Sequence, residues 1–395
     1  MKERVILHSD VNNFFASVEC ATKPELKDKP VAVTGNPKKR TGIILAKNEL
    51  AKKYGVKTGQ VIGEAKALCP QLVCLPPHYD LYEEISRKLH ELYLSYTNFV
   101  EPLGLDECWL DVTDSMAYLN KSGLQIADEI RQKVKQEFGF TVSVGVSFSK
   151  IFAKLGSDLK KPDYTTVIDK DNYKKITYNL PLNSIIGIGR RLENKFSSIS
   201  VSTIGDFVKL EDSFLQHLMG VTGLNLKQAL LGEEKSQVAN YYTLPPPKSI
   251  GNGTTTIEDI IKRQDFEKVV AFLAEKISDR MIKHKVVAGT LSLSIKDSKL
   301  KTTHKSMKIS PTNSVKELVK NAMKIADSIW KFDYPVRALR LKASSLASSE
   351  AVQLSFFDSK KDYSEAVELI NKKYGKIALA SNMSSFLNTN KHPQE

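Results

Sequence analysis

The order of strand-like and helical segments in the first half of the chain limits the possible fold most strongly. Short apolar runs typical of buried strands alternate with segments whose apolar residues recur at helical spacing. Strands are predicted at 4–10, twice within 99–113 around a tight turn, and at 141–147, and helices at 11–20, 81–96 and 122–138. This β–α–β–β–α–β order is that of a ferredoxin-like sheet in which residues 21–75 are inserted. At 395 residues the chain is expected to be a multidomain α+β protein.

Three carboxylates stand at the ends of these predicted strands. Asp10 closes the apolar run at 4–10, and Asp106 and Glu107 lie in the turn within 99–113. An acid among apolar residues is costly unless a cation compensates its charge. Oxygen-only ligands suit a hard cation such as Mg²⁺, and two such ions are the usual device for phosphoryl transfer. Spacing alone leaves open the alternative that these acids are structural residues of strand ends and turns.

Basic charge is concentrated in one region of the chain. The net charge is +13, and residues 241–345 alone hold 20 Lys and Arg against 10 Asp and Glu. Such segregation favours a nucleic-acid-binding module, with a solvated lysine-rich surface as the alternative. Strands are predicted at 290–296, 302–309 and 336–343, with helices at 265–284 and 314–330.

Two further features of the sequence indicate contact with a nucleic-acid duplex. In the predicted strand 336–343, Arg340 and Lys342 share the face opposite two leucines, which would give a basic surface. Gly187 and Gly189 lie between two helical stretches just before Arg190. This pattern indicates a helix-hairpin-helix that offers backbone N–H groups to phosphates, with an ordinary helix–helix turn as the alternative.

Composition argues against other classes. The four cysteines include no Cys-x-x-Cys pair, so neither a disulfide scaffold nor a structural zinc site is expected. No apolar run is long enough to span a bilayer, and the N-terminal segment is too polar for a signal peptide. A cytoplasmic protein without a membrane partner is expected.

Five motifs, in the same order along the chain, resemble those of the Y-family translesion DNA polymerases. They are HSDVNNFFASVE (8–19), EPLGLDECWLDVTDS (101–115), GVSFSKIFAKLGSDLKKP (145–162), the glycine hairpin near 187, and KSIGNGTTT (248–256). The resemblance extends from residue 1 to about 345 and is strongest to bacterial polymerase IV and UmuC-like enzymes. It implies a template-directed, low-fidelity DNA polymerase that transfers nucleotides from dNTP to a primer 3′-hydroxyl on damaged DNA.

The same resemblance implies a right-hand polymerase that acts as a monomer. Its expected parts are a palm (1–20 and 76–166), small fingers (21–75), a helical thumb with a helix-hairpin-helix (167–236), a linker (237–248), an α/β little finger that binds DNA (249–347) and a tail (348–395). The different-class alternative is a catalytically silent factor that binds DNA and the sliding clamp. Retention of all three carboxylates argues against it.

Residue roles follow from the resemblance as well. Asp10, Asp106 and Glu107 match the metal-binding carboxylates, with the Val11 carbonyl as a further ligand to two Mg²⁺ ions. The aromatic Phe15 matches the steric gate that excludes a ribose 2′-hydroxyl.

Other matched residues are expected to line the nucleotide site. Phe14 precedes the gate on the same wall, the N–H groups of Asn12 and Asn13 stand where phosphates approach, and Lys161 matches a lysine that contacts the triphosphate.

The fingers depart from the polymerase IV pattern. A Tyr and an Arg that hold the triphosphate in polymerase IV are replaced by Glu49 and Lys52, and Lys47 is expected to assist. A lysine keeps the attraction to phosphate but loses the bidentate geometry of arginine. This pattern is nearer to the UmuC-like enzymes.

A short motif in the tail implies a further partner. The pentapeptide Gln353-Leu354-Ser355-Phe356-Phe357 resembles the bacterial sliding-clamp-binding motif and lies between polar, loop-like segments. An apolar trio in a polar tail is suited to anchor in a hydrophobic groove.

Overall fold

The computed structural model describes residues 3–36, 42–331 and 333–349. Of these, residues 3–36 and 42–244 form one compact unit (unit 1), and the described residues from 245 to 349 form a second (unit 2). The division falls within the segment expected to be a linker. Within the described ranges, no helix has both the length and the apolar character needed to cross a membrane.

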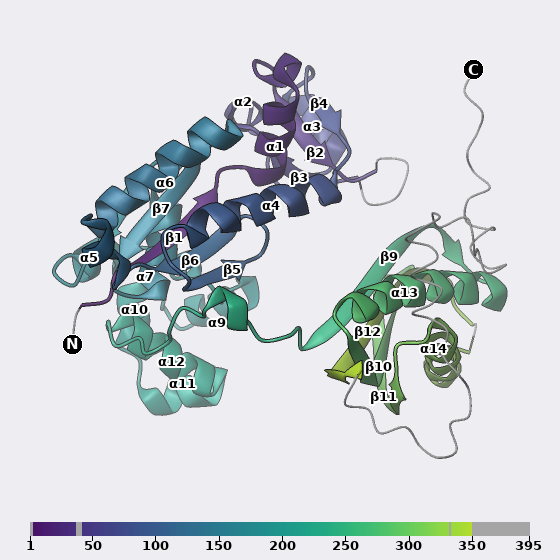
Figure 1. The fold of residues 1–395 in the computed structure, drawn as a ribbon. Helices are drawn as coiled ribbons and strands as arrows, with labels where there is room; N and C mark the ends of the chain where they lie inside the picture. Colours follow the sequence, from purple (N-terminus) through teal and green to yellow (C-terminus); the bar gives the residue numbers. More distant parts are fainter. Residues whose placement is uncertain (1–2, 37–41, 332, 350–395) are drawn as a thin grey trace. The chain divides into compact units, whose positions relative to one another are not determined.

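Unit 1 contains a five-stranded sheet (Figure 1). The strands follow the order β5 (Val100–Leu103), β6 (Glu107–Asp111), β1 (Ile6–Val11), β7 (Val142–Ser147) and β8 (Thr165–Ile168). Strand β1 is central and pairs antiparallel with both β6 and β7, whereas β8 pairs parallel with β7. Strand β8 is not among the predicted strands, because its sequence TTVI does not alternate apolar and polar residues. The α+β architecture expected from the element order is confirmed.

One face of β1 is covered by α4 (Tyr79–Leu94) and α6 (Gly123–Phe138). Leu7 packs into a core that contains the buried side chains of both helices. The Ser9 Oγ atom lies 2.9 Å from the hydroxyl of Tyr93 on α4. This face is therefore the main hydrophobic core of the sheet.

The other face of β1 meets α7 (Lys150–Leu159). Side chains alternate along a strand, so His8 and Asp10 point to the side opposite Leu7 and Ser9. His8 Nδ1 lies 2.8 Å from Ser157 Oγ, and Asp10 pairs with Lys154. Helix α7 thus brings basic and hydroxyl groups to the face that carries Asp10.

Helix α7 approaches the sheet closely because β7 has a glycine at the contact. A Cβ atom at Gly145 would lie 1.9 Å from the carbonyl oxygen of Ala153 and 2.6 Å from the amide nitrogen of Ser157. No side chain fits such a gap, so only glycine permits this backbone approach.

The predicted helix at 11–20 begins later than expected. Val11 still belongs to β1, and α1 runs over Phe14–Thr22. Asn13 has a φ of 55°, a left-handed conformation that separates the strand from the helix. Asparagine tolerates this conformation better than most residues.

The described residues between 21 and 75 form a small layer of their own at the end of α1. A three-stranded sheet of order β3-β2-β4 packs on short helices over a compact core. The elements are η1 (Pro24–Leu26), β2 (Val31–Thr34), β3 (Ile44–Lys47), α2 (Glu49–Lys53), α3 (Ile62–Leu68) and β4 (Val73–Leu75).

The rest of unit 1 is helical. The short α5 (Ser115–Leu119) follows β6, and the segment after β8 contains α8 (Tyr173–Thr177), η2 (Leu182–Ser184), α9 (Arg190–Ser197), α10 (Ile204–Val208), α11 (Asp212–Met219), α12 (Val221–Leu230) and η3 (Tyr241–Thr243). The helices from α8 to α12 share one core, in which Phe196 and Phe207 meet edge to face at 5.3 Å.

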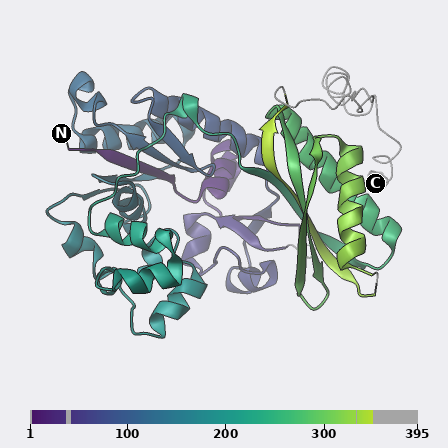
Figure 2. The same ribbon diagram turned by 90° about the horizontal axis from the view of Figure 1, so that it is seen from below.

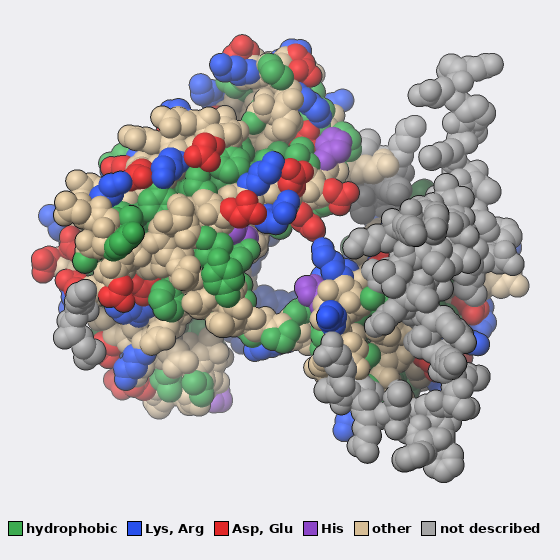
Figure 3. Space-filling view, viewed as in Figure 1, with side chains coloured by type: hydrophobic (Ala, Val, Ile, Leu, Met, Phe, Trp, Pro, Cys, Tyr) green, Lys and Arg blue, Asp and Glu red, His purple; other side chains and the backbone are tan. Residues whose placement is uncertain are grey.

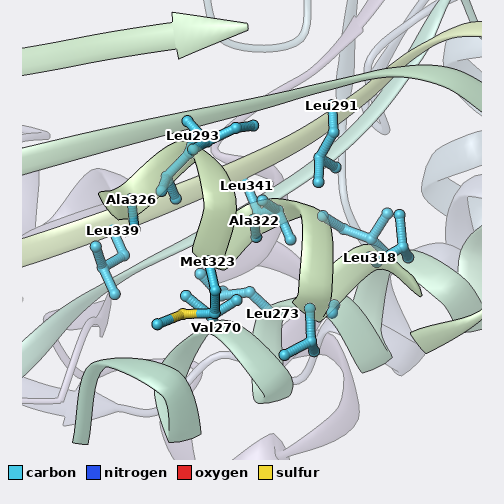
Figure 4. Close-up of a cluster of buried hydrophobic side chains, with 14 of the residues drawn as sticks. Val270, Leu273, Leu291, Leu293, Leu318, Ala322, Met323, Ala326, Leu339 and Leu341 are labelled. Carbon is cyan, nitrogen blue, oxygen red and sulfur yellow. The ribbon is translucent and has the colours of Figure 1, made fainter. Parts of the chain in front are cut away.

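Unit 2 is a four-stranded antiparallel sheet with two helices on one face (Figure 2). The strand order is β11 (Thr302–Thr312), β10 (Val286–Asp297), β12 (Val336–Ser348) and β9 (Ser249–Ile260), and the helices are α13 (Arg263–Lys283) and α14 (Val315–Ile329). Figure 4 shows Leu291 and Leu293 of β10 in one buried hydrophobic cluster with Leu273 of α13 and Leu318 of α14. The three strands and two helices predicted here are confirmed.

We predict that Gly145→Ala destabilises the protein by about 3 kcal/mol or more, because the added methyl group overlaps backbone atoms of α7 that cannot move independently. The urea concentration at the midpoint of unfolding measures the effect. The matched control is Gly63→Ala in α3, where nothing lies within 4 Å of the new Cβ and alanine favours the helix. Equal midpoints for Gly145→Ala and wild type would contradict the close approach of α7.

Candidate active site

Pairing of β1 with β6 brings the three predicted carboxylates together. Asp10 and Glu107 are direct partners in the antiparallel register. The amide nitrogen of Val11 donates a 3.0 Å hydrogen bond to the carbonyl of Asp106, which places the turn before β6 beside the end of β1. Gly104 opens this turn with a φ of 84°. Residues almost a hundred positions apart therefore lie at one strand end.

Two lysines neutralise part of this acidic cluster. Lys154 Nζ lies 3.0 Å from Asp10 Oδ2 and 2.9 Å from Glu107 Oε2. Lys161 Nζ lies 2.8 Å from Asp10 Oδ1, and both lysines also contact Asp158 at the end of α7. Lys161, which is expected to contact the triphosphate, lies beside the carboxylates. Lys154 was not predicted, although the sequence motif at 145–162 contains it.

The electrostatics of the cluster are uneven. Burial, together with the charges of Asp10 and Glu107, raises the pKa of Asp106 to about 6. Burial would also raise the pKa of Glu107, but hydrogen bonds from His8 and Lys154 outweigh it and lower that pKa. Burial opposes the charged form of Lys154, yet its acidic neighbours raise its pKa. Asp106 is thus the carboxylate whose charge is least compensated.

The three carboxylates do not by themselves surround one metal position. In the described part of the chain, no three His, Cys, Asp or Glu side chains converge as a complete metal-binding group. The ammonium group of Lys154 lies on both Asp10 and Glu107, where a cation would also be attracted. The donors are carboxylate oxygens alone, which fits a hard divalent cation that keeps waters and shares substrate phosphates.

His8 is a buried neighbour of the cluster. Its Nδ1 contacts Ser157 Oγ at 2.8 Å, its Nε2 lies 3.4 Å from Glu107 Oε2, and its ring meets Trp109 edge-on at 5.1 Å. Burial lowers the pKa of His8. The imidazole of His8 therefore lies beside the Glu107 carboxylate.

Asn12 has a different role from the one expected. Its N–H group donates to the carbonyl of Thr141 at 3.0 Å, so the predicted approach of this N–H to a phosphate is wrong. Its buried side chain donates to Ser143 Oγ, and its Oδ1 accepts a 3.0 Å hydrogen bond from the amide of Asp163. Asn12 therefore anchors the turn that follows Lys161.

Asn13 and the fingers are joined by a polar contact. Asn13 Nδ2 donates to Glu49 Oε1 at 2.8 Å, and Lys52 Nζ lies 3.4 Å from the same oxygen. Burial and the nearby charge of Lys52 lower the pKa of Lys47. Glu49 and Lys52, the fingers residues that depart from the polymerase IV pattern, thus lie close to Lys47, where β3 ends and α2 begins.

The two adjacent phenylalanines of α1 lie in different surroundings. Phe14 is only 4% exposed and belongs to the core of the sheet, so it is not an open wall of a nucleotide site as expected. Phe15 is partly exposed and stacks on Tyr82 with ring centroids 4.3 Å apart and planes 12° apart. Phe15 is therefore the aromatic of this pair that can meet a ligand.

Unit 2 presents the basic surface that the strand pattern predicts. Arg340 and Lys342 are exposed, whereas Leu339, which precedes Arg340, and Leu341, which lies between the two basic residues, are buried. By contrast, the face of unit 1 in Figure 3 mixes acidic and basic side chains over α4, where Lys88 and Glu84 pair at 2.7 Å.

The glycine hairpin is present, but of its two flanking segments only the one that follows it, α9, is an α-helix. Gly187 has a φ of 94°, and Gly189 is the N-cap of α9, whose first residue Arg190 is exposed. The helix expected before the hairpin is only the three-residue turn η2. A Cβ at either glycine would meet nothing within 4 Å, so the hairpin backbone is accessible.

The pentapeptide at 353–357 lies outside the described residues.

Comparisons with known proteins identify the family of the chain. Residues 9–158 match the impB/mucB/samB family, and residues 247–356 match the impB/mucB/samB family C-terminal domain. A DNA polymerase IV of Acetivibrio thermocellus is 40% identical over 381 residues, which is 94% of this chain and 95% of that protein. The DNA polymerase IV 1 of Bacillus subtilis is 33% identical and covers 95% of this chain and 91% of its own length.

A solved structure supports the fold. The Y-family DNA polymerase chimera Dbh-Dpo4(243-245)-Dbh superposes with a TM-score of 0.78 at 22% identity, over 87% of this chain and 99% of the chimera. The family and the polymerase function inferred from the motifs are confirmed, and the catalytically silent alternative gains no support. The chain therefore belongs to the impB/mucB/samB family of Y-family translesion DNA polymerases and is a DNA-directed DNA polymerase of the polymerase IV type.

Proposed function

We propose that Asp10, Asp106, Glu107 and the Val11 carbonyl hold two Mg²⁺ ions for nucleotidyl transfer past damaged template positions. Polymerases of this kind generally use a divalent metal. The carrying observation is the geometry: Asp10 and Glu107 are register partners, and Asp106 lies beside them at the same strand end, where burial and the neighbouring carboxylates raise its pKa. A divalent cation at these oxygens would relieve the repulsion. When bound, such ions lower the pKa of the primer 3′-hydroxyl and neutralise the departing pyrophosphate.

The chain's own cations support this chemistry. Lys154 Nζ contacts both Asp10 and Glu107, and Lys161 Nζ contacts Asp10 Oδ1. The ammonium groups of Lys154 and Lys161 lie at the carboxylates where the metal ions would bind. Both would therefore attract the negative charge of an incoming triphosphate. Lys161, fixed by the turn that Asn12 anchors, is assigned to the triphosphate. Lys47 and Lys52 at the fingers, with Asn13 tied to Glu49, supply further charge for the same group.

Phe15 is assigned as the steric gate of the sugar. It is the partly exposed aromatic of α1, one turn beyond the metal-binding strand end, and it stacks on Tyr82. A ring held against the sugar C2′ leaves no room for a hydroxyl. Selection of dNTP over rNTP then depends on the position of this ring.

Primer–template DNA is proposed to bind mainly through charge and backbone contacts. Unit 2 carries Arg340 and Lys342 on its open sheet face, and the hairpin at Gly187 and Gly189 offers accessible backbone beside Arg190. Phosphate contacts of this kind bind any sequence, which a polymerase requires.

The tail motif is proposed to tether the enzyme to the sliding clamp. Leu354, Phe356 and Phe357 would enter a hydrophobic groove while Gln353 hydrogen-bonds at its rim, with Ser355 between them. A tether raises the local concentration of the primer end, which compensates for weak grip by small fingers.

We expect Asp106→Ala to lower primer extension with Mg²⁺ by about 1000-fold or more, because metal-ion stabilisation of the transition state contributes several kcal/mol. DNA affinity should change little, since phosphates bind to lysine and arginine elsewhere. The exposed Asp171→Ala is the control for loss of one acid. Extension within tenfold of wild type would show that Asp106 is not a metal ligand.

Phe15→Ala should admit ribonucleotides, because the gate acts by steric exclusion and alanine leaves space for the 2′-hydroxyl. Single-nucleotide incorporation with dNTP and rNTP gives the two values of kcat/KM. Phe14→Leu, a change within the core, should keep the wild-type preference. A Phe15→Ala enzyme that rejects rNTP as strongly as wild type would exclude Phe15 as the gate.

Alanine at Gln353, Leu354, Phe356 and Phe357 together should remove stimulation by a loaded clamp but preserve extension without it. The expected clamp affinity is on the order of micromolar, about −8 kcal/mol. Ser359→Ala, just beyond the motif, is the control. Full stimulation of the quadruple variant would place the clamp contact elsewhere in the chain.

A further inference from the structure

One buried carboxylate of unit 1 lies outside the proposed metal-binding set. Glu19 is 0% exposed, yet three donors converge on it. The Tyr82 hydroxyl donates to Oε1 at 2.6 Å, His78 Nδ1 lies 2.6 Å from the same oxygen, and Lys23 Nζ lies 2.9 Å from Oε2. Burial would raise the pKa of Glu19, but these hydrogen bonds outweigh it and lower that pKa. A carboxylate satisfied in this way is rigid and negatively charged at neutral pH.

Tyr82 connects this carboxylate to the aromatic Phe15. Phe15 and Glu19 are four residues apart on α1, so their side chains lie on the same helix face. Tyr82 of α4 spans that turn, with its ring stacked on Phe15 at 4.3 Å and its hydroxyl bonded to Glu19. The ring of Phe15 is therefore backed by a phenol whose far end is fixed.

A second tyrosine provides an internal comparison. Tyr79 meets Phe15 edge-on with centroids 5.9 Å apart and meets Tyr82 at 6.0 Å. Its side chain is about half exposed, at 51%, and no carboxylate hydrogen bond involves it among the described contacts. Tyr79 thus packs at the rim of the same aromatic group without an anchored hydroxyl.

We propose that Glu19 is a positioning residue for sugar selection, which acts through the Tyr82 hydroxyl to hold the Phe15 ring in place. The proposal rests on the proposed role of Phe15 as the steric gate. A gate excludes a hydroxyl only if its ring cannot retreat, and a stacked ring alone can slide along its partner. The bond from Tyr82 to a buried charge prevents this sliding, because breaking it would leave the carboxylate short of a donor. Glu19 itself contacts neither substrate nor metal in this assignment.

The experiment removes the hydroxyl but keeps the ring. Tyr82→Phe is expected to lower the ratio of kcat/KM for dNTP over rNTP by about tenfold, the factor equivalent to loss of one hydrogen bond to a charged group. The fall should come from faster rNTP incorporation, which general destabilisation would not produce. Glu19→Gln keeps an oxygen acceptor without the charge, so its ratio should lie between those of Tyr82→Phe and wild type. Tyr79→Phe is the matched control and should keep the wild-type ratio.

A double variant tests the route through Phe15. In a Phe15→Ala enzyme the ring to be positioned is missing, so adding Tyr82→Phe should cause no further change in the ratio. An additional fall in the double variant would overturn the route through Phe15. An equal fall in Tyr79→Phe and Tyr82→Phe would overturn the role of the anchored hydroxyl.

Failure of the inference and failure of the gate assignment give different results. A wild-type ratio in Phe15→Ala would remove the gate itself and the inference with it. A lowered ratio in Phe15→Ala, with wild-type ratios in both Tyr82→Phe and Glu19→Gln, would leave the gate in place and overturn the positioning role. Thermal unfolding of each variant identifies any that is not folded, and Tyr82→Phe decides the question if Glu19→Gln is one of these.

Discussion

Repulsion among carboxylates at one strand end is the constraint on which the active site depends. Asp10 and Glu107 are register partners, and their charges help to raise the pKa of Asp106. Such a cluster is unfavourable for the folded protein unless cations are brought to it. Lys154 and Lys161 supply that charge. The surrounding structure can be understood as the means of holding these opposed groups together.

Close packing behind β1 fixes those cations. Gly145 lets the backbone of α7 approach the sheet, so Lys154 projects toward the strand end rather than into solvent. Beyond α7, the turn after Lys161 is held by Asn12 and by Arg131, whose guanidinium contacts Asp163 at 2.8 Å. The site therefore rests on backbone approach and a polar network, both of which are less tolerant of change than apolar packing.

Sugar selection and DNA binding use different physics from catalysis. At the proposed sugar gate, the stack of Phe15 on Tyr82, backed by the buried Glu19, would provide a rigid surface. On unit 2, exposed charges such as Arg340 and Lys342 are free to follow a phosphate backbone without fixed geometry. In this proposal, rigid side chains would surround the reacting nucleotide, and adaptable charge would be kept for the duplex.

Sequence alone determined the elements, the carboxylates and the family. The periodicity of apolar residues located most described strands and the four longest described helices, and the alternation of Leu339 and Arg340 predicted the two faces of β12. The motifs identified Asp10, Asp106 and Glu107 before any geometry was known. These features are local, so they can be read from neighbouring residues.

Tertiary structure decided what distant residues do to one another. The role of Asn12 as an anchor, the core position of Phe14 and the contact of Lys154 with two carboxylates all depend on elements far apart in sequence. The same is true of Glu19, which meets Tyr82 from another helix. Spacing along the chain carries no information about such contacts, because they arise only when sheet pairing and helix packing bring separate segments to within hydrogen-bond distance.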